Sequence, residues 1–354
     1  MPELPEVEVV RAGLEPAVTG AVIRSVVVYD ERSLRRHAGP SEDFVERLEG
    51  RSILGAVRRG KFLWLPLSSA LHPASSSEIQ DIGRYGQNDH PKNAERPPNT
   101  LNGADQTPEF PKGGAVEEAL VVHLGMSGQV LLRDMERPDD ALLRIRLDLV
   151  HPAHGGLRVA FVDQRIFGSM AIDQLVPTPD GAAGGAGGAA ALVPARVSHI
   201  ARDPLDPAFD DDRFLADLRK RRTGIKRAML DQDLVSGIGN IYADESLWAA
   251  RIHYDQQAAT LSRARATTLL AEVRRVLGRA LAEGGTSFDA QYVNVNGASG
   301  YFSRSLNAYG RQGEPCPRCG RPIVRESFMN RGSHFCAFCQ RVRNRQTTLL
   351  HPPS

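Results

Sequence analysis

The chain begins with MPELPEVE (residues 1–8), in which a proline at the second position is followed by three carboxylates. Initiator methionine is usually removed before a small residue, and its removal exposes the secondary amine of Pro2. An α-amino group titrates at about pH 8, about two units below a lysine side chain, so it can act as a nucleophile at neutral pH. Glu3 and Glu6 lie close enough in sequence to move protons for such an amine. A simple helix start explains the same residues, because proline and acids suit the first helical turn.

Hydrophobic spacing continues this stretch as a helix, with one apolar face made by Val7, Val10, Leu14 and Val18. A short helix capped by Ser41 is predicted at residues 41–48. Runs of β-branched and aromatic residues bounded by Gly or Pro predict strands at residues 21–29, 52–67, 120–132, 142–149, 157–163 and 169–175. The pattern predicts an N-terminal domain, residues 1–177, that is a β-sandwich with its first helix on one side.

Two stretches lack hydrophobic periodicity. Residues 68–117 are rich in Ser, Pro, Asn and Gly, which predicts an inserted, largely disordered loop. Residues 178–195 are mostly Gly and Ala and are expected to form a flexible linker at the domain boundary.

Helical spacing predominates in the second half, which is also the basic half. Helices are predicted to begin near Phe214 and to cover residues 225–230, 239–249 and 262–283. Residues 1–195 carry 20 basic and 26 acidic side chains, whereas residues 196–354 carry 24 and 16. The sequence therefore predicts an α+β multidomain protein whose helical domain, residues 196–310, and C-terminal domain, residues 311–345, bind a polyanion.

The four cysteines form two C-x2-C pairs, Cys316 with Cys319 and Cys336 with Cys339. This spacing suits one tetrahedral zinc ion held by four thiolates. Four protein ligands leave no position for water, so the zinc is expected to be structural. The chain has no apolar run of membrane-spanning length and no signal peptide, which predicts a cytosolic protein.

Several blocks together resemble the formamidopyrimidine-DNA glycosylases, the bacterial Fpg or MutM family of bifunctional base-excision repair enzymes. They are the four-cysteine tail and the segments PELPEVEVV (residues 2–10), RRGKFLWL (58–65), HLGMSG (123–128), LDQDLVSGIGNIYADESLW (230–248) and GGTSFDAQYVNVNG (284–297). Residues 286–301, which overlap the last segment, resemble the family's loop that closes over the extruded purine. The resemblance implies an N-terminal β-sandwich, a helix-two-turn-helix domain and a zinc-finger β-hairpin.

The activity implied is that of a DNA-formamidopyrimidine glycosylase and abasic-site lyase, acting as a monomer on damaged double-stranded DNA. Oxidised purines such as 8-oxoguanine would be removed through an iminium at Pro2, followed by β,δ-elimination. Glu3 matches the family's proton shuttle, and Glu6 is expected to help position the site. Lys61 matches an active-site lysine, and Arg331 matches the arginine at the tip of the zinc hairpin.

The resemblance also assigns contacts to DNA. His123, Lys226 and Asn240 match positions that hold phosphates. Asn240 also suits a helix cap, and the two roles can coexist. Met126, Arg165 and Phe167 match the trio that fills the space left by the flipped nucleotide. Without the resemblance, core positions explain Met126 and Phe167 equally well. The family usually reads DPRRFG where this chain has DQRIFG (residues 163–168), so Gln164 and Ile166 depart from it.

Two other interpretations of the function remain open. An endonuclease VIII-like glycosylase for oxidised pyrimidines shares much of this pattern, although Leu4 and the separate Met126 and Arg165/Phe167 positions favour the Fpg branch. A catalytically silent DNA-binding paralogue would keep the zinc hairpin and the helices, but it would not need intact Pro2, Glu3 and Lys61. An activity assay on duplexes carrying different lesions separates these readings.

Overall fold

A computed structural model describes residues 2–71, 116–285, 295 and 302–342. Its strands are β1 Val22–Val28, β2 Arg51–Ile53, β3 Val57–Arg59, β4 Phe62–Leu71, β5 Glu118–His123, β6 Gly128–Arg133, β7 Leu143–His151, β8 Gly155–Asp163, β9 Ser169–Pro177, β10 Leu192–Pro194, β11 Val324–Phe328 and β12 Arg331–Phe335. The α-helices are α1 Leu4–Val18, α2 Ser41–Glu46, α3 Asp211–Lys220, α4 Ile225–Met229, α5 Asn240–Ala249 and α6 Arg263–Ala282. Short 3-10 turns are η1 Glu31–Leu34, η2 Ala195–Val197, η3 Ala258–Thr260 and η4 Phe302–Ser305.

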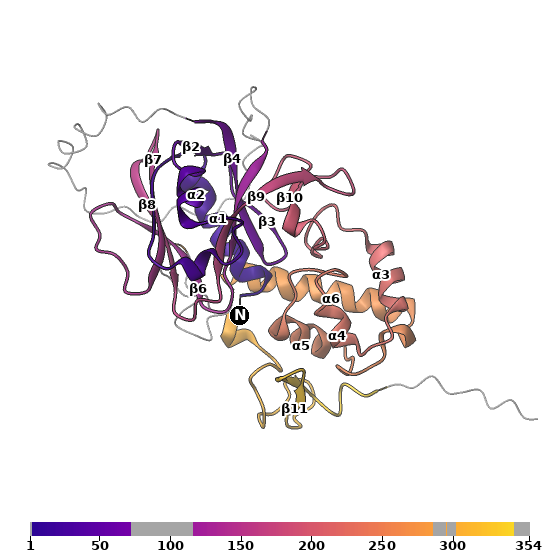
Figure 1. Cartoon of the computed structure of the whole chain (residues 1–354). Coiled ribbons are helices and arrows are strands. Elements are labelled where there is room, and N and C mark those ends of the chain that lie inside the picture. Colours follow the sequence, from indigo (N-terminus) through magenta and orange to yellow (C-terminus); the bar gives the residue numbers. More distant parts are fainter. Residues whose placement is uncertain (1, 72–115, 286–294, 296–301, 343–354) are drawn as a thin grey trace, which may run out of the picture.

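The first ten strands form one antiparallel sheet whose two halves enclose a shared core (Figure 1). Strand order is β10-β9-β5-β4-β2-β1-β7-β8-β6, and β3 pairs with β4. Leu120 of β5 and Phe161 of β8 lie in the same buried cluster as Val7 and Leu14 of α1. The sandwich with its N-terminal helix is thus confirmed. The predicted single strand at residues 52–67 is instead three strands, because the chain turns at Gly55 and at Gly60, where φ is +56°.

Two local expectations were wrong. Ser41 does not cap α2: the helix begins at Ser41 after Pro40, and the Ser41 hydroxyl donates to Glu31 Oε1 at 2.8 Å. The segment 178–195 is not a free linker, since β10 pairs with β9 and covers the outer face of β4 through Val193 and Trp64. Its glycines permit close packing of backbones. The predicted disorder of residues 68–117 falls mainly on 72–115, which lie outside the described residues, although β4 continues to Leu71.

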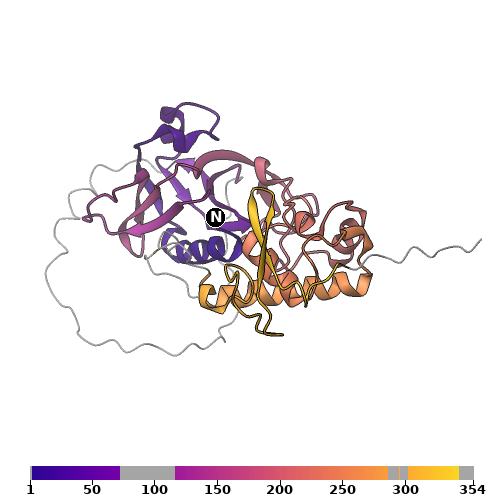
Figure 2. The ribbon, with the colours of Figure 1, turned by 90° about the horizontal axis from the view of Figure 1, so that it is seen from below.

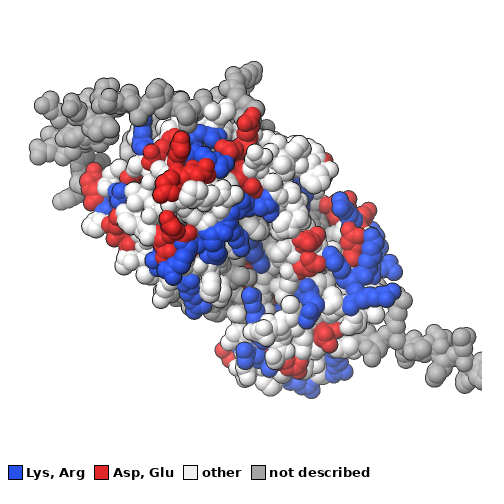
Figure 3. Space-filling model, viewed as in Figure 1, with Lys and Arg blue, Asp and Glu red and all other residues white. Residues whose placement is uncertain are grey.

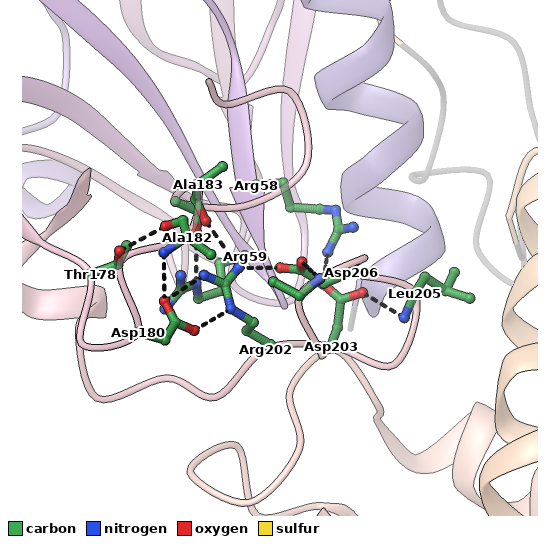
Figure 4. Close-up of polar contacts among 12 residues, drawn as sticks. Arg58, Arg59, Thr178, Asp180, Ala182, Ala183, Arg202, Asp203, Leu205 and Asp206 are labelled. Atoms are coloured by element: carbon green, nitrogen blue, oxygen red, sulfur yellow. Dashed lines mark hydrogen bonds and ion pairs between the residues drawn. The ribbon is translucent and has the colours of Figure 1, made fainter. Parts of the chain in front are cut away.

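Ion pairs join this segment and β3 to the start of the helical domain (Figure 4). Arg58 pairs with Asp203 at 2.8 Å, and both side chains are almost fully buried. Arg202 pairs with Asp180 at 2.6 Å and with Asp206 at 2.7 Å. These contacts connect the sheet domain to the helical domain.

Leu4 connects the two cores from the other side. It starts α1, yet it packs in the helical core together with Ile238 and Tyr242, and its backbone N–H donates to Gly237 O at 2.9 Å. The N-terminus consequently lies at the junction of the two domains in both views (Figures 1 and 2). The hairpin β11–β12 stands beside this junction (Figure 2).

Candidate active site and DNA interface

Glu3 is held by the first turn of α5. Its carboxylate accepts hydrogen bonds from the backbone N–H groups of Gly239 (2.7 Å), Ile241 (3.0 Å) and Tyr242 (3.3 Å). Glu3 is only 2% exposed, and this burial raises its pKa against the lowering influence of nearby Lys61. A carboxyl with a raised pKa can carry the proton that a general acid needs. The N-terminus of α5, which begins at Asn240, is therefore occupied by a carboxylate of the protein itself.

Glu6 lies in α1, one helical turn after Glu3, and binds the backbone of Glu3. Its carboxylate accepts the backbone N–H of Glu3 at 2.9 Å and the Tyr242 hydroxyl at 2.6 Å. Pro2 precedes this pair and is buried. Met1 lies outside the described residues. The start of α1 thus holds Glu3 against α5, and Pro2 adjoins Glu3 in the sequence.

Lys61 faces the same region from the turn between β3 and β4. Its ammonium donates to Ile238 O at 2.8 Å, and burial lowers its pKa while Glu3 opposes that shift. A cavity of about 530 Å³ is lined by Lys61, His123, Gly239 and Arg331. Arg331 is exposed at the hairpin, immediately after a two-residue turn in which Met329 and Asn330 have φ of +46° and +59°. The structure therefore brings Lys61, His123 and Arg331 together around one cavity.

His123 ends β5 at the wall of this cavity. Burial, reinforced by the positive charges of Arg36, Arg35 and Lys61, lowers the pKa of His123 to about 4. Its Nδ1 accepts the backbone N–H of Gly125 at 3.1 Å. The ring is therefore neutral at pH 7 with its proton on Nε2, and that N–H can donate to a phosphate oxygen.

Met126, Arg165 and Phe167 are all exposed, on two loops whose backbones touch. A Cβ added to Gly125 would lie 2.3 Å from the carbonyl carbon of Phe167. Basic side chains gather where the sheet domain faces the helical domain (Figure 3). The exposure of Met126, Arg165 and Phe167 leaves all three side chains available to a ligand.

Lys226 and Asn240 both bind groups of the protein in this structure. Lys226 is fully buried, and its ammonium donates to Ser333 Oγ at 2.9 Å and pairs with Asp244 at 2.7 Å. Asn240 Nδ2 donates to Gly332 O at 3.0 Å. Both side chains hold the residues that follow Arg331. The charge of Lys226 is enclosed and compensated by Asp244 in this structure, and the expected phosphate contact stays a prediction.

The four cysteine sulfurs lie within 4.8 Å of one another, so they can converge on one tetrahedral ion. The indole N–H of Trp248 donates to Cys316 Sγ at 3.4 Å, which supports a thiolate. Cys316 and Cys336 are buried with Trp248 and Ile323 in a small apolar cluster. The residues fit a structural zinc ion with no open position.

Comparisons with known proteins cover almost the whole chain. Residues 1–170 match the formamidopyrimidine-DNA glycosylase N-terminal domain, residues 200–291 match its H2TH domain, and residues 313–342 match the zinc finger found in FPG and IleRS. The formamidopyrimidine-DNA glycosylase of Leifsonia xyli is 62% identical over 342 residues, which are 97% of this chain and 100% of that protein. The chain belongs to the formamidopyrimidine-DNA glycosylase family.

A second member, from Thermobifida fusca, is 47% identical over 96% of this chain and 97% of its own length. Among solved structures, Lactococcus lactis Fpg in complex with DNA containing Fapy-dG is 26% identical, with a TM-score of 0.67 and coverage of 96% and 99%. The same protein bound to DNA with an abasic site gives a TM-score of 0.68, with the same identity and coverage. These findings confirm the resemblance, the fold class and the structural zinc.

Two features of the glycosylase site were missed by sequence reasoning. Tyr242 binds Glu6, and Gln232 holds the loop before α5 through Gly237 N at 3.0 Å and Ile238 O at 3.1 Å. Both lie within the quoted block at residues 230–248, which was the available signal. The family's purine-covering loop, residues 286–301, lies outside the described residues except for Val295. In the part of the chain that the structure describes, no helix is long and apolar enough to span a membrane.

Proposed function

We propose that this chain removes oxidised purines, such as 8-oxoguanine and formamidopyrimidines, from double-stranded DNA and then cleaves the strand, acting as a monomer. The observation that carries the proposal is the placement of Glu3. Its carboxyl is buried beside Pro2, held by α5, and close enough to Lys61 for the two charges to influence each other's pKa. A binding protein without chemistry has no need of a buried carboxyl with a raised pKa next to its N-terminus.

In the proposed reaction, the Pro2 nitrogen forms a bond to C1′ of the damaged nucleotide while the bond from C1′ to the base breaks. Glu3 gives a proton to the sugar ring oxygen, the ring opens, and an iminium joins Pro2 to the deoxyribose. Loss of a C2′ proton then expels the 3′ phosphate, and a second elimination expels the 5′ phosphate. Glu6 positions Glu3 through its backbone N–H.

Contacts to the DNA follow from the charges around the cavity. Lys61, His123 and Arg331 are proposed to bind the phosphates next to the lesion, and binding should therefore weaken steeply with salt. Met126, Arg165 and Phe167 would occupy the space of the extruded nucleotide. Lys226 and Asn240 enter the proposal as supports of the hairpin that carries Arg331.

Borohydride trapping tests the proposal. Purified protein is incubated with duplexes carrying 8-oxoguanine, thymine glycol or an abasic site, and the reduced complex is digested and analysed by mass spectrometry. We expect a deoxyribose remnant on the peptide that begins at Pro2, with 8-oxoguanine preferred over thymine glycol. A remnant on Lys61, with Pro2 unmodified, would overturn the mechanism. Replacing Pro2 with a residue that retains Met1 is the matched control, because it should abolish trapping while DNA binding remains.

A further inference from the structure

Arg35 lies in the turn that follows η1. It binds the backbone of the loop that carries Arg165 and Phe167. Its guanidinium donates to three consecutive carbonyls: Ile166 O at 2.7 Å, Phe167 O, and Gly168 O at 2.9 Å. No carboxylate pairs with Arg35 within the described ranges. The planar fork of an arginine can serve several acceptors at once, which the single ammonium of a lysine cannot do in the same way.

The loop needs such a partner because its backbone takes an unusual path. Ile166 is a β-branched residue with φ of +54°, a conformation that such residues rarely adopt. Three carbonyls in succession face Arg35 as a result. On the opposite side, the Asp163 carboxylate accepts the backbone N–H groups of Arg165 at 3.2 Å and Gly168 at 2.7 Å. The loop is therefore held by an anion at its N–H groups and by a cation at its carbonyls.

The side chains that this loop presents have little else to orient them. Phe167 is 49% exposed, Arg165 is exposed, and Met126 on the neighbouring loop is 38% exposed. Their positions are set mainly by the two backbones, which meet at Gly125. Ser127 connects the same loops, because its hydroxyl donates to Asp163 Oδ1 at 2.5 Å.

We propose that Arg35 is a positioning residue for base extrusion: by binding the carbonyls of Ile166, Phe167 and Gly168, it holds Phe167 and Arg165 where they fill the gap in the duplex. The inference rests on the proposed function, since it concerns the duplex from which a nucleotide is extruded. Arg35 itself does not touch the reacting atoms. Its effect is confined to substrates in which a base stack must be opened and a partner base left behind.

A purely electrostatic role is the competing explanation, because Arg35 lies near Arg36 and His123. Arg36 offers a matched control. It belongs to the same turn and carries the same charge, and its side chain makes no hydrogen bond to the loop within the described residues. Arg35→Lys keeps the charge and removes the fork, whereas Arg36→Ala removes a charge and leaves the fork.

The experiment compares a duplex containing 8-oxoguanine with a single-stranded oligonucleotide containing an abasic site, which has no stack to open. Single-turnover excision from the duplex at saturating protein should fall roughly tenfold in Arg35→Lys, as expected for a misplaced positioning group. Borohydride trapping on the single strand should keep the wild-type rate. The fluorescence of a 2-aminopurine placed next to the lesion reports unstacking, and its rise should be slower with Arg35→Lys. Arg36→Ala should change only the affinity for the duplex.

Each outcome decides the matter. Wild-type excision by Arg35→Lys, or an equal loss on the duplex and the single strand, would overturn the positioning role. A loss in Arg36→Ala equal to that in Arg35→Lys would also overturn it, because Arg36→Ala leaves the hydrogen bonds from Arg35 to the loop in place. Thermal unfolding of each variant confirms that it folds. Arg35→Gln, which removes both the charge and the guanidinium, provides a second test of the positioning role. Absence of a trapped complex between the wild-type protein and any substrate would instead contradict the proposed function. That outcome is distinct from a failure of Arg35 to position the loop.

Discussion

Lys226 and Asp244 form a buried ion pair, with 2.7 Å between Nζ and Oδ1 and side-chain exposures of 0% and 1%. Asp244 also accepts the Ser333 hydroxyl at 3.1 Å and the backbone N–H of His334 at 2.8 Å. The pair therefore ties α4 and α5 to β12, directly behind Arg331. In this structure the buried cation therefore supports the placement of the hairpin.

Removing one partner should be costly, because it leaves an uncompensated charge in the interior. We expect Lys226→Met to lower the free energy of unfolding by about 3–5 kcal/mol, and Lys226→Met with Asp244→Asn to recover part of the loss. Urea denaturation measures both. Lys220→Met is the matched control, since Lys220 pairs with Asp217 at the surface and should cost less than about 1 kcal/mol. Equal effects at the two lysines would contradict the structural role.

Zinc removal should affect the hairpin first. The C-terminal domain has a small apolar cluster around Cys316 and Cys336, too little to fold without its metal. We expect one zinc ion per chain by atomic absorption, and we expect chelation to abolish DNA binding before the sheet domain unfolds. Fluorescence anisotropy with labelled DNA and circular dichroism follow the two events. A disulfide among these cysteines in reduced protein would rule out the assignment.

The ion pair between Asp180 and Arg202 predicts a pH dependence of stability. Arg202 donates a hydrogen bond to the Asp180 carboxylate and thereby lowers the pKa of Asp180 from 3.8 to about 2. A carboxyl with a lowered pKa in the folded state contributes stability above its unfolded pKa and loses it as the pH falls through the folded value. The stability difference between wild type and Asp180→Asn should thus be constant above about pH 5 and vanish as the pH falls from 3.8 towards about 2.

Asp180 is 42% exposed at its side chain, so the contribution should stay below about 1 kcal/mol. Urea titrations at several pH values measure it. In an Arg202→Met background, Asp180→Asn should lose its pH-dependent effect. Persistence of the effect in that background would show that Arg202 is not its cause.

The sequence predicted features that depend on residues close together in the chain, and it did not predict those that depend on residues far apart. The cysteine spacing predicted the zinc site because each pair lies within one turn, and the sulfurs do converge. The contact between Glu3 and Gly239 spans 236 positions, and no local pattern indicates it. Composition misled at residues 178–195, where glycines allow backbones to pack closely. The match of Lys226 to a family position gave no sign that its side chain is fully buried.

The raised pKa of Glu3 predicts the pH dependence of base excision. The carboxyl must be protonated to donate to the sugar ring oxygen, so single-turnover excision should decline as the pH rises through its pKa, which burial raises. Glu3→Gln should reduce excision by roughly 100-fold or more and should abolish this decline. DNA affinity, measured on uncleaved duplex, should be preserved. An unchanged pH profile in Glu3→Gln would exclude Glu3 as the proton donor.

Gly239 allows α5 to hold Glu3, and it can be tested without touching an ionisable group. Its φ of −125° suits any residue, so the constraint is purely one of space. A Cβ at this position would lie 2.3 Å from Glu3 Cδ and 2.4 Å from Oε1. Gly239→Ala must therefore displace the carboxylate from the N–H groups of Gly239, Ile241 and Tyr242. We expect excision to fall by roughly 100-fold, the scale of a catalytic group moved by about 1 Å.

Gly278, within α6, is the matched control, because a Cβ there meets nothing within 4 Å. Gly278→Ala should keep wild-type excision and gain about 0.5–1 kcal/mol of stability, since alanine is favoured over glycine inside a helix. Zinc content and binding to uncleaved duplex should be normal in both variants, which separates displacement of Glu3 from a general folding defect. If Gly239→Ala excises 8-oxoguanine at the wild-type rate, the position of the Glu3 carboxylate against α5 does not govern the chemistry.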